Sequence, residues 1–207
     1  LGPGAGGLAV SMQPIATAMG QRAQMLVLDN RGFNEGQSLY TRLEEQVLDY
    51  VDAVQADQPE GKLHLVGHSL GGSIVFEMAI RLSQMGREVD LIFLDSILYP
   101  TNESEIGIGL DRFSYLKVLW ERIYHTPAPE ELNEAQLFDR VKDQLVALGM
   151  VDSSSADANL NRFIDVYVQQ IQWFSDYRPQ SKFTGNLTLL HADDGAIVGD
   201  FKPVVFE

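Results

Sequence analysis

The segment KLHLVGHSLGG, from Lys62 to Gly72, constrains the fold more than any other part of the chain. Its apolar start predicts a buried strand, and the residues from Ser73 to Met85 have helical spacing. Between them lies the pattern G-x-S-x-G, centred on Ser69. A strand-to-helix turn this sharp strains the serine backbone and exposes its hydroxyl, and it needs Gly67 and Gly71 because Cβ atoms there would meet the strand and the helix. We therefore predict that Ser69 is a nucleophile.

Composition excludes several classes of function. The 207 residues, 45% of them hydrophobic, suit a single globular domain over residues 1–207. The net charge of -14 argues against nucleic-acid binding and is attributed to solubility. The absence of cysteine excludes disulfides, thiolate catalysis and cysteine metal sites, and the four scattered histidines predict no metal site. With no apolar run of about 18 residues and no basic signal sequence at the start, we expect no membrane span and a cytoplasmic protein.

Apolar runs and helical spacing alternate along much of the chain. Besides the strand before Ser69, short apolar runs predict strands at 25–28, 89–94, 187–190 and 203–206. Helices are predicted over 10–19, with an early interruption at Pro14, and over 39–54. This alternation is typical of a parallel α/β sheet flanked by helices, in which the ligand crevice lies at the carboxyl ends of the strands. Asp29, Ser69 and Asp95 all lie at such ends.

The pattern changes between residues 99 and 180, where no strand is predicted. Apolar positions recur helically in 113–124, 132–148 and 160–174, and turns separate these helices. We interpret 99–180 as a helical lid over the site, with an extra helical layer as the alternative. Trp120, Tyr124 and Trp173 are candidates for lining a pocket beneath it, although aromatic residues at helical spacing also occur as ordinary core.

A serine nucleophile needs a base, a carboxylate that orients the base, and an oxyanion hole. The backbone N–H of Leu70 and one from the glycine-rich turn near the start, assigned to Gly4, are predicted to form the hole. Asp95 is the predicted acid, with a helix or turn cap as the alternative, and Asp193 and Asp194 offer a second acid position. Asp29 is interpreted as a turn residue.

The base is the part that the sequence does not assign with certainty. Hydrolases with this elbow run in the order Ser, Asp, His, and the histidine usually follows the last strand. We expect it beyond Glu207, and we expect a first strand before Leu1, so that both termini are truncated. His191 has the correct chain order and is the less favoured substitute, because the end of that strand more often carries an acid.

At this point the residues resemble the thioesterase domains of nonribosomal peptide and polyketide synthetases, which have the α/β-hydrolase fold. Four segments carry the resemblance: PGAGG at 3–7, GHSLGG with the helix after it, LDS at 94–96, and YRPQSKFTGNLTLLHADDG at 177–195. The resemblance implies a Ser69 nucleophile, an Asp95 acid, an oxyanion hole at Gly4 and Leu70, and a lid over an acyl pocket. The G-x-H segment that the family places after its final strand is absent before Glu207.

The resemblance also implies a reaction. A carrier protein, expected upstream in the same synthetase, would present a peptidyl or polyketidyl thioester on its phosphopantetheine arm, and Ser69 would take the acyl group. Release would follow by hydrolysis or by macrocyclisation, and the chain itself would bind no cofactor. The alternatives are a free-standing editing (type II) thioesterase or other serine esterase, and a hydrolase-fold protein that binds acyl ligands or partners without turnover.

Overall fold

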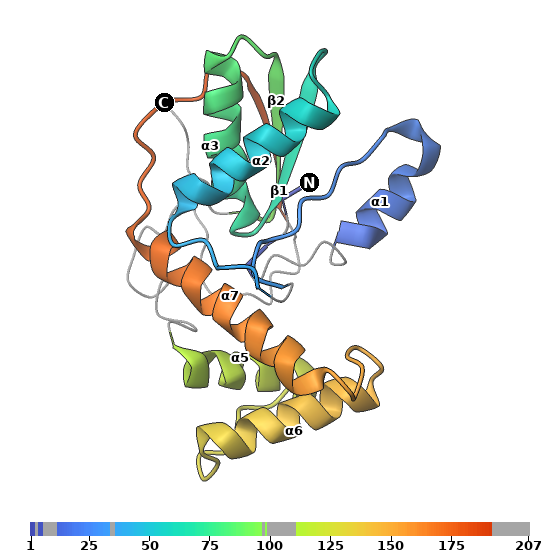
Figure 1. Ribbon diagram of the computed structural model, residues 1–207, viewed down its shortest axis with the longest axis vertical. Helices are drawn as coiled ribbons and strands as arrows, with labels where there is room; N and C mark the ends of the chain where they lie inside the picture. The colour runs from blue at the N-terminus through green and yellow to red at the C-terminus, as the bar shows by residue number, and fades with distance from the viewer. Residues whose placement is uncertain (3, 6–11, 34–35, 97, 99–110, 192–207) are drawn as a thin grey trace.

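A parallel sheet organises the upper part of the protein, as viewed in Figure 1, in the computed structural model, which describes residues 1–2, 4–5, 12–33, 36–96, 98 and 111–191. In these residues three strands pair in the order β1-β2-β3, all parallel. The strands are β1 (Leu63–His68), β2 (Val89–Leu94) and β3 (Asn186–Leu190). All three were predicted from their apolar runs, and the register pairs Leu94 with both His68 and Leu190. The carboxyl ends of the three strands therefore meet at one edge.

The start of the chain continues the sheet beyond β1. The Gly2 N–H donates to Val66 O at 2.7 Å, and the His68 N–H donates to Gly2 O at 3.1 Å. On its other side, the amino group of Leu1 donates to Leu26 O at 2.7 Å and the Leu28 N–H donates to Leu1 O at 3.2 Å. The glycine-rich turn that follows Gly2 therefore begins at the same sheet edge as the residues after β1.

Two sequence predictions near the start of the chain are wrong in detail. Residues 25–28 form no regular strand, although two backbone hydrogen bonds join them to Leu1. Pro14 does not interrupt a helix but stands in the first turn of α1 (Gln13–Met19), where its missing N–H has no intrahelical acceptor to lose. A short 3-10 helix, η2 (Gly20–Arg22), follows. The predicted strand at 203–206 lies outside the described residues.

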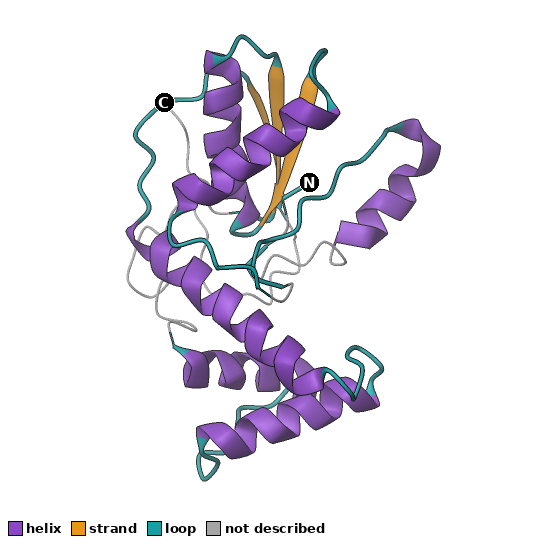
Figure 2. Ribbon diagram, viewed as in Figure 1, coloured by secondary structure: helices purple, strands orange, loops and turns teal. Residues whose placement is uncertain are grey.

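Helices α2 (Leu43–Asp57) and α3 (Gly71–Gln84) pack against each other, and α3 packs on β1 and β2 (Figures 1 and 2). Both agree with the predicted spacing, except that α2 begins four residues after Leu39. Helix α3 is apolar nearly all round because it lies between the sheet and α2; Ile74, Met78 and Leu82 are each at most 1% exposed. This buried helix carries the turn that contains Ser69 at its start.

The remaining helices form a second hydrophobic cluster away from the sheet. They are α5 (Arg112–Tyr124), α6 (Glu134–Ala147) and α7 (Ala156–Asp176), close to the three predicted ranges. Helix α5 is capped by the Asp111 side chain, and α6 by a reciprocal capping box between Asn133 and Gln136. Helix α7 belongs to both parts of the molecule, since its first half packs with α5 and α6 while Phe174 belongs to the core around the sheet.

A chain of buried polar side chains joins α7 to α2. The Gln170 Nε2 donates to Gln46 Oε1 at 3.2 Å, and the Gln46 Nε2 donates to the Tyr50 hydroxyl at 2.8 Å. Tyr50 in turn donates to Leu28 O at 3.4 Å. All three side chains are at most 3% exposed, and buried polar groups of this kind need hydrogen-bond partners within the protein.

Among the described residues, no helix has both the length and the apolar character that crossing a membrane would require.

The close approach of β1 to α3 gives a test of the fold. A Cβ on Gly67 would lie 2.6 Å from Gly71 O, so Gly67→Ala is expected to lower the free energy of unfolding by about 3 kcal/mol through overpacking against rigid backbone. Gly149→Ala is the control, because its φ of +69° is unfavourable for alanine but no atom lies within 4 Å of the added methyl; it should cost roughly 1 kcal/mol. Urea denaturation measures both, and equal costs would contradict a tight crossing.

Candidate functional site

Ser69 lies in a strained turn between β1 and α3. Its φ is +53°, in the left-handed region that residues other than glycine seldom adopt. The turn is closed by backbone hydrogen bonds, because the Ser69 N–H donates to Leu94 O at 3.2 Å and Ser69 O accepts from the Gly72 N–H at 3.0 Å. The side chain remains partly exposed. This is the geometry of a nucleophile elbow.

Two backbone segments, at Gly4 and Leu70, lie next to Ser69. A Cβ on Gly4 would lie 3.2 Å from Ser69 Cβ and 3.1 Å from His68 Nδ1, so the glycine-rich turn runs directly against the serine. Leu70 precedes the first residue of α3, and within the described residues no acceptor pairs with the N–H of Leu70 or Gly4. Both groups can therefore donate to an oxygen atom that reaches Ser69.

Asp95 and His191 lie together at the ends of neighbouring strands. His191 Nδ1 is 2.7 Å from Asp95 Oδ1, and both side chains are partly exposed. The Asp95 backbone is also strained, with φ +45°, and its N–H donates to Leu190 O at 2.8 Å. An Asp that binds Nδ1 of an imidazole leaves Nε2 available for proton transfer. The sequence places both residues at strand ends, but it cannot show that β2 and β3 are neighbours in the sheet. The contact between Asp95 and His191 exists because these two strands lie side by side.

The other three histidines have different surroundings. Burial lowers the pKa of the half-buried His68, an effect that Asp95 opposes and Arg122 reinforces. His64, which lies on β1, points to solvent and has its Nδ1 3.4 Å from Asp90 Oδ2. His125 ends α5 in a left-handed conformation. Of the three, only His68 lies at the Ser69 turn.

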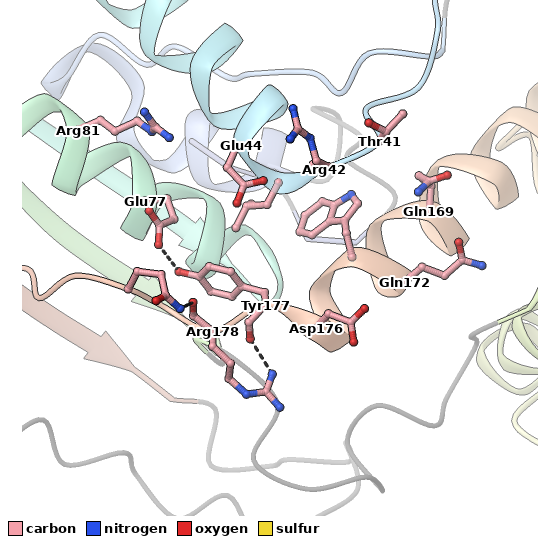
Figure 3. Close-up of a pocket in the computed structure, with 13 residues that line it drawn as sticks. Thr41, Arg42, Glu44, Glu77, Arg81, Gln169, Gln172, Asp176, Tyr177 and Arg178 are labelled. Atoms are coloured by element: carbon pink, nitrogen blue, oxygen red, sulfur yellow. Dashed lines mark hydrogen bonds between the residues drawn. The ribbon is translucent and has the colours of Figure 1, made fainter.

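The three candidate pocket aromatics lie in two places. Trp120 and Tyr124 stack on each other in the cluster of α5, α6 and α7, with ring centroids 4.1 Å apart. Trp173 instead lines an open hollow of about 880 Å³ between α2, α3 and the end of α7 (Figure 3). Tyr177 lines the same hollow and donates to Glu77 Oε1 at 2.6 Å. Ser69 is not among the residues that line this hollow.

The remaining candidate residues are Asp29, Asp193 and Asp194. Asp29, interpreted above as a turn residue, is instead exposed in the loop two residues before the turn at Arg31–Gly32. Asp193 and Asp194, the second acid position, lie outside the described residues. Within the described ranges, no group of three or more His, Asp or Glu side chains is placed to hold a metal ion.

Comparison with known proteins agrees with this geometry. The family model described as "Thioesterase domain" matches residues 1–194. A dimodular nonribosomal peptide synthase of Bacillus subtilis (strain 168) is 29% identical over 185 residues, which are 88% of this chain and 8% of that protein. The chain thus spans less than a tenth of the length of this relative.

Solved structures show the same fold at low sequence identity. A four-domain nonribosomal peptide synthetase bound to AMP and glycine aligns with a TM-score of 0.77 at 20% identity, covering 98% of this chain and 16% of that one. The type II thioesterase BorB from the borrelidin biosynthetic cluster aligns with a TM-score of 0.57 at 20% identity, covering 93% of this chain and 71% of that one. With a match to the family model over nearly its whole length and a hydrolase-type elbow in its parallel sheet, the chain belongs to the thioesterase domain family and has an α/β-hydrolase fold.

Proposed function

We propose that the chain releases a peptidyl or polyketidyl group from the phosphopantetheine thioester of a carrier protein, through an ester on Ser69. The observation that carries the proposal is the strained Ser69 turn, with the Gly4 backbone against its side chain and the Asp95–His191 pair at the next two strand ends. Membership of the thioesterase family supplies the reaction class.

The first half of the reaction transfers the acyl group. An imidazole accepts the proton of Ser69 Oγ while that oxygen attacks the thioester carbonyl carbon. The resulting oxyanion accepts hydrogen bonds from the N–H groups of Leu70 and Gly4, which are fixed in place before the reaction. Collapse of the tetrahedral intermediate breaks the C–S bond, and the imidazolium returns its proton to the departing thiolate of the phosphopantetheine. An ester on Ser69 remains.

The second half releases the product. The imidazole takes a proton from water, or from an amine or hydroxyl of the acyl chain itself, as that group attacks the carbonyl carbon of the Ser69 ester, and the same oxyanion hole holds the intermediate. Collapse of the intermediate breaks the bond between the carbonyl carbon and Ser69 Oγ, and the imidazolium returns its proton to Oγ. Water yields a linear acid, and an internal group yields a macrolactam or macrolactone. The phosphopantetheine stays with the carrier and is not a prosthetic group of this chain.

Among the described residues, His191 is the histidine in contact with Asp95, and we propose it as the base. Its Nδ1 is the atom in contact with the carboxylate, which is the orientation the reaction needs. A histidine after Glu207 is the alternative base, as expected from the chain order.

The helices α5, α6 and α7 are proposed to be the lid. Ala5, next to the oxyanion residue Gly4, packs against both the sheet core and the core of these helices, so the helical cluster adjoins the Ser69 turn. A cover at this position would keep water from the ester and favour an internal nucleophile. Trp120 and Tyr124 are proposed to contact the acyl chain from the lid, and Trp173 from its junction with α2.

The partner is proposed to be a carrier domain upstream in the same synthetase, because the relative in Bacillus subtilis is a much longer nonribosomal peptide synthase. A free-standing editing thioesterase is the second candidate, favoured by the fold shared with a type II thioesterase. Residues before Leu1 distinguish them, since a carrier-protein serine motif there indicates a terminal domain.

Replacement of the nucleophile tests the enzyme assignment. Ser69→Ala is expected to abolish covalent labelling by a fluorophosphonate probe, because the attacking oxygen is removed, and intact mass spectrometry measures the adduct. Ser83→Ala, an exposed serine of the same helix, is the control and should label fully. Absence of an adduct on the unaltered protein would instead favour a protein that binds acyl ligands without turnover.

Replacement of the acid tests the assignment of Asp95. Asp95→Asn keeps the shape of the side chain but can bind the wrong imidazole tautomer, so release of a model acyl thioester should slow by about 10⁴-fold without loss of folding. The release rate and the circular dichroism spectrum measure the two effects. Asp29→Asn, at an exposed loop position, should leave the rate unchanged. If Asp95→Asn is silent and a change at Asp193 or Asp194 is not, the acid has been misassigned.

Replacement of His191 identifies the base. If His191 transfers the proton, His191→Ala should slow thioester release by at least 10³-fold, and the double variant with Asp95→Asn should be no slower than the worse single variant, because the two residues act as a unit. His64→Ala removes an exposed histidine and is the control. A His191→Ala protein that keeps its rate while Asp95→Asn loses it would assign the base to a histidine after Glu207.

A further inference from the structure

The Ser96 hydroxyl lies between the two strained turns of the site. Ser96 follows Asp95 directly, after β2 has ended. Its Oγ is 2.9 Å from Gly67 O and 3.1 Å from Leu94 O, so its proton can be donated to either carbonyl. Gly67 belongs to the end of β1, two residues before Ser69. One hydroxyl therefore connects the residue after the acid with the strand that leads into the nucleophile.

The hydroxyl also shares an acceptor with the nucleophile itself. Leu94 O accepts from the Ser69 N–H at 3.2 Å as well as lying within reach of Ser96 Oγ. Neither Ser69 nor Asp95 is in a conformation that its residue type favours, with φ values of +53° and +45°. Such conformations persist where surrounding contacts hold them. The carbonyls of Gly67 and Leu94 are the points at which Ser96 supplies such contacts.

Packing fixes the position of the hydroxyl. Gly72 in the first turn of α3 lies so close that a Cβ there would be 2.6 Å from Ser96 Cβ and 2.9 Å from its Oγ. The serine is half-buried and confined between α3 and the end of β1. A side chain confined in this way has little freedom to turn its hydroxyl elsewhere.

We propose that Ser96 is a positioning residue, whose hydroxyl holds the Ser69 turn and the Asp95 turn at the separation that the reaction requires. This inference rests on the proposed function of Ser69 and Asp95. Ser96 touches neither the substrate nor the reacting atoms in this account, and its effect passes through the two backbones. A purely structural hydroxyl would stabilise the fold but leave the reactivity of Ser69 unchanged.

The experiment compares Ser96→Thr with Ser96→Val. Both add the same branched volume next to Gly72, but only threonine keeps the hydroxyl, so the difference between them isolates the hydrogen bonds. Ser96→Ala is the third variant and removes the hydroxyl without added volume. The rate of fluorophosphonate labelling of Ser69 is measured on each variant well below its melting temperature. We expect Ser96→Val to label about 10- to 100-fold more slowly than Ser96→Thr, because small displacements of reacting groups have large effects on rate. Ser96→Ala should label more slowly than the unaltered protein by about the same factor.

Ser73→Ala is the matched control. The Ser73 hydroxyl is fully buried in the first turn of α3 and donates to Leu98 O at 2.6 Å, so its loss removes a comparable buried hydrogen bond whose acceptor is neither Gly67 O nor Leu94 O. This variant should melt at a lower temperature and label at the normal rate. Equal labelling rates for Ser96→Val and Ser96→Thr would overturn the proposal, whatever their melting temperatures.

A second measurement separates this proposal from that of the reaction. The Nδ1 proton of His191, held by Asp95, should give a downfield proton NMR signal that Ser96→Thr keeps and that Ser96→Val and Ser96→Ala shift or lose. If the unaltered protein takes no fluorophosphonate, the proposed function fails, and this signal still decides whether Ser96 positions Asp95. A signal that is identical in all three variants would contradict that role.

Discussion

The site depends on one contact, between the end of β1 and the first turn of α3. Gly67 lies so close to Gly71 O that no side chain fits between them, and the chain must reverse from strand to helix within a few residues. The left-handed backbone conformation of Ser69 completes that reversal. The Ser69 side chain is therefore at the end of the strand, and the N–H of Leu70 lies just before the first residue of α3. The proposed nucleophile and one proposed oxyanion donor therefore follow from the same packing constraint.

The strain of the two turns is small compared with the packing that maintains it. A left-handed conformation costs roughly 1–2 kcal/mol at Ser69 and less at Asp95, because aspartate adopts this region more readily than serine. Complete burial of a single large apolar side chain contributes about 1.5–3 kcal/mol, and α3 buries Ile74, Met78 and Leu82 at 1% exposure or less. Hydrogen bonds from the strained residues to Leu94 O and Leu190 O then fix each turn to the next strand. The sheet order thus brings Ser69, Asp95 and His191 to one edge in sequence.

The elements with strong periodicity could be predicted from the sequence, and the contacts between elements could not. β2 was predicted to the residue because polar residues bound its apolar run. Helix α3 was predicted at 73–85 and lies at 71–84, within two residues at each end, because its apolar spacing follows a glycine-rich turn. The run at 25–28 has strand composition but makes only two hydrogen bonds with Leu1, a fact set by tertiary pairing. The His191–Asp95 contact likewise depends on β3 lying beside β2. Local pattern carries no information about which strands are neighbours.

The position of α7 bears on how a lid of these helices could move. Its second half is joined to α2 by the buried hydrogen bond from Gln170 to Gln46 Oε1, and separating the two would take that donor from the buried Gln46 oxygen, at a cost of about 1–3 kcal/mol. Its first half, which includes Leu160 and Ile164, packs with α5 and α6 and also reaches the loop before α2 through a part-buried hydrogen bond from Arg162 Nη1 to Phe33 O at 3.3 Å. Opening of the cluster therefore needs the least free energy if α7 bends on the N-terminal side of Gln170 and α5 and α6 move together with its first half. The junction near Trp173 would stay in place, while the side of the cluster that holds Trp120 and Tyr124 would move relative to Ser69.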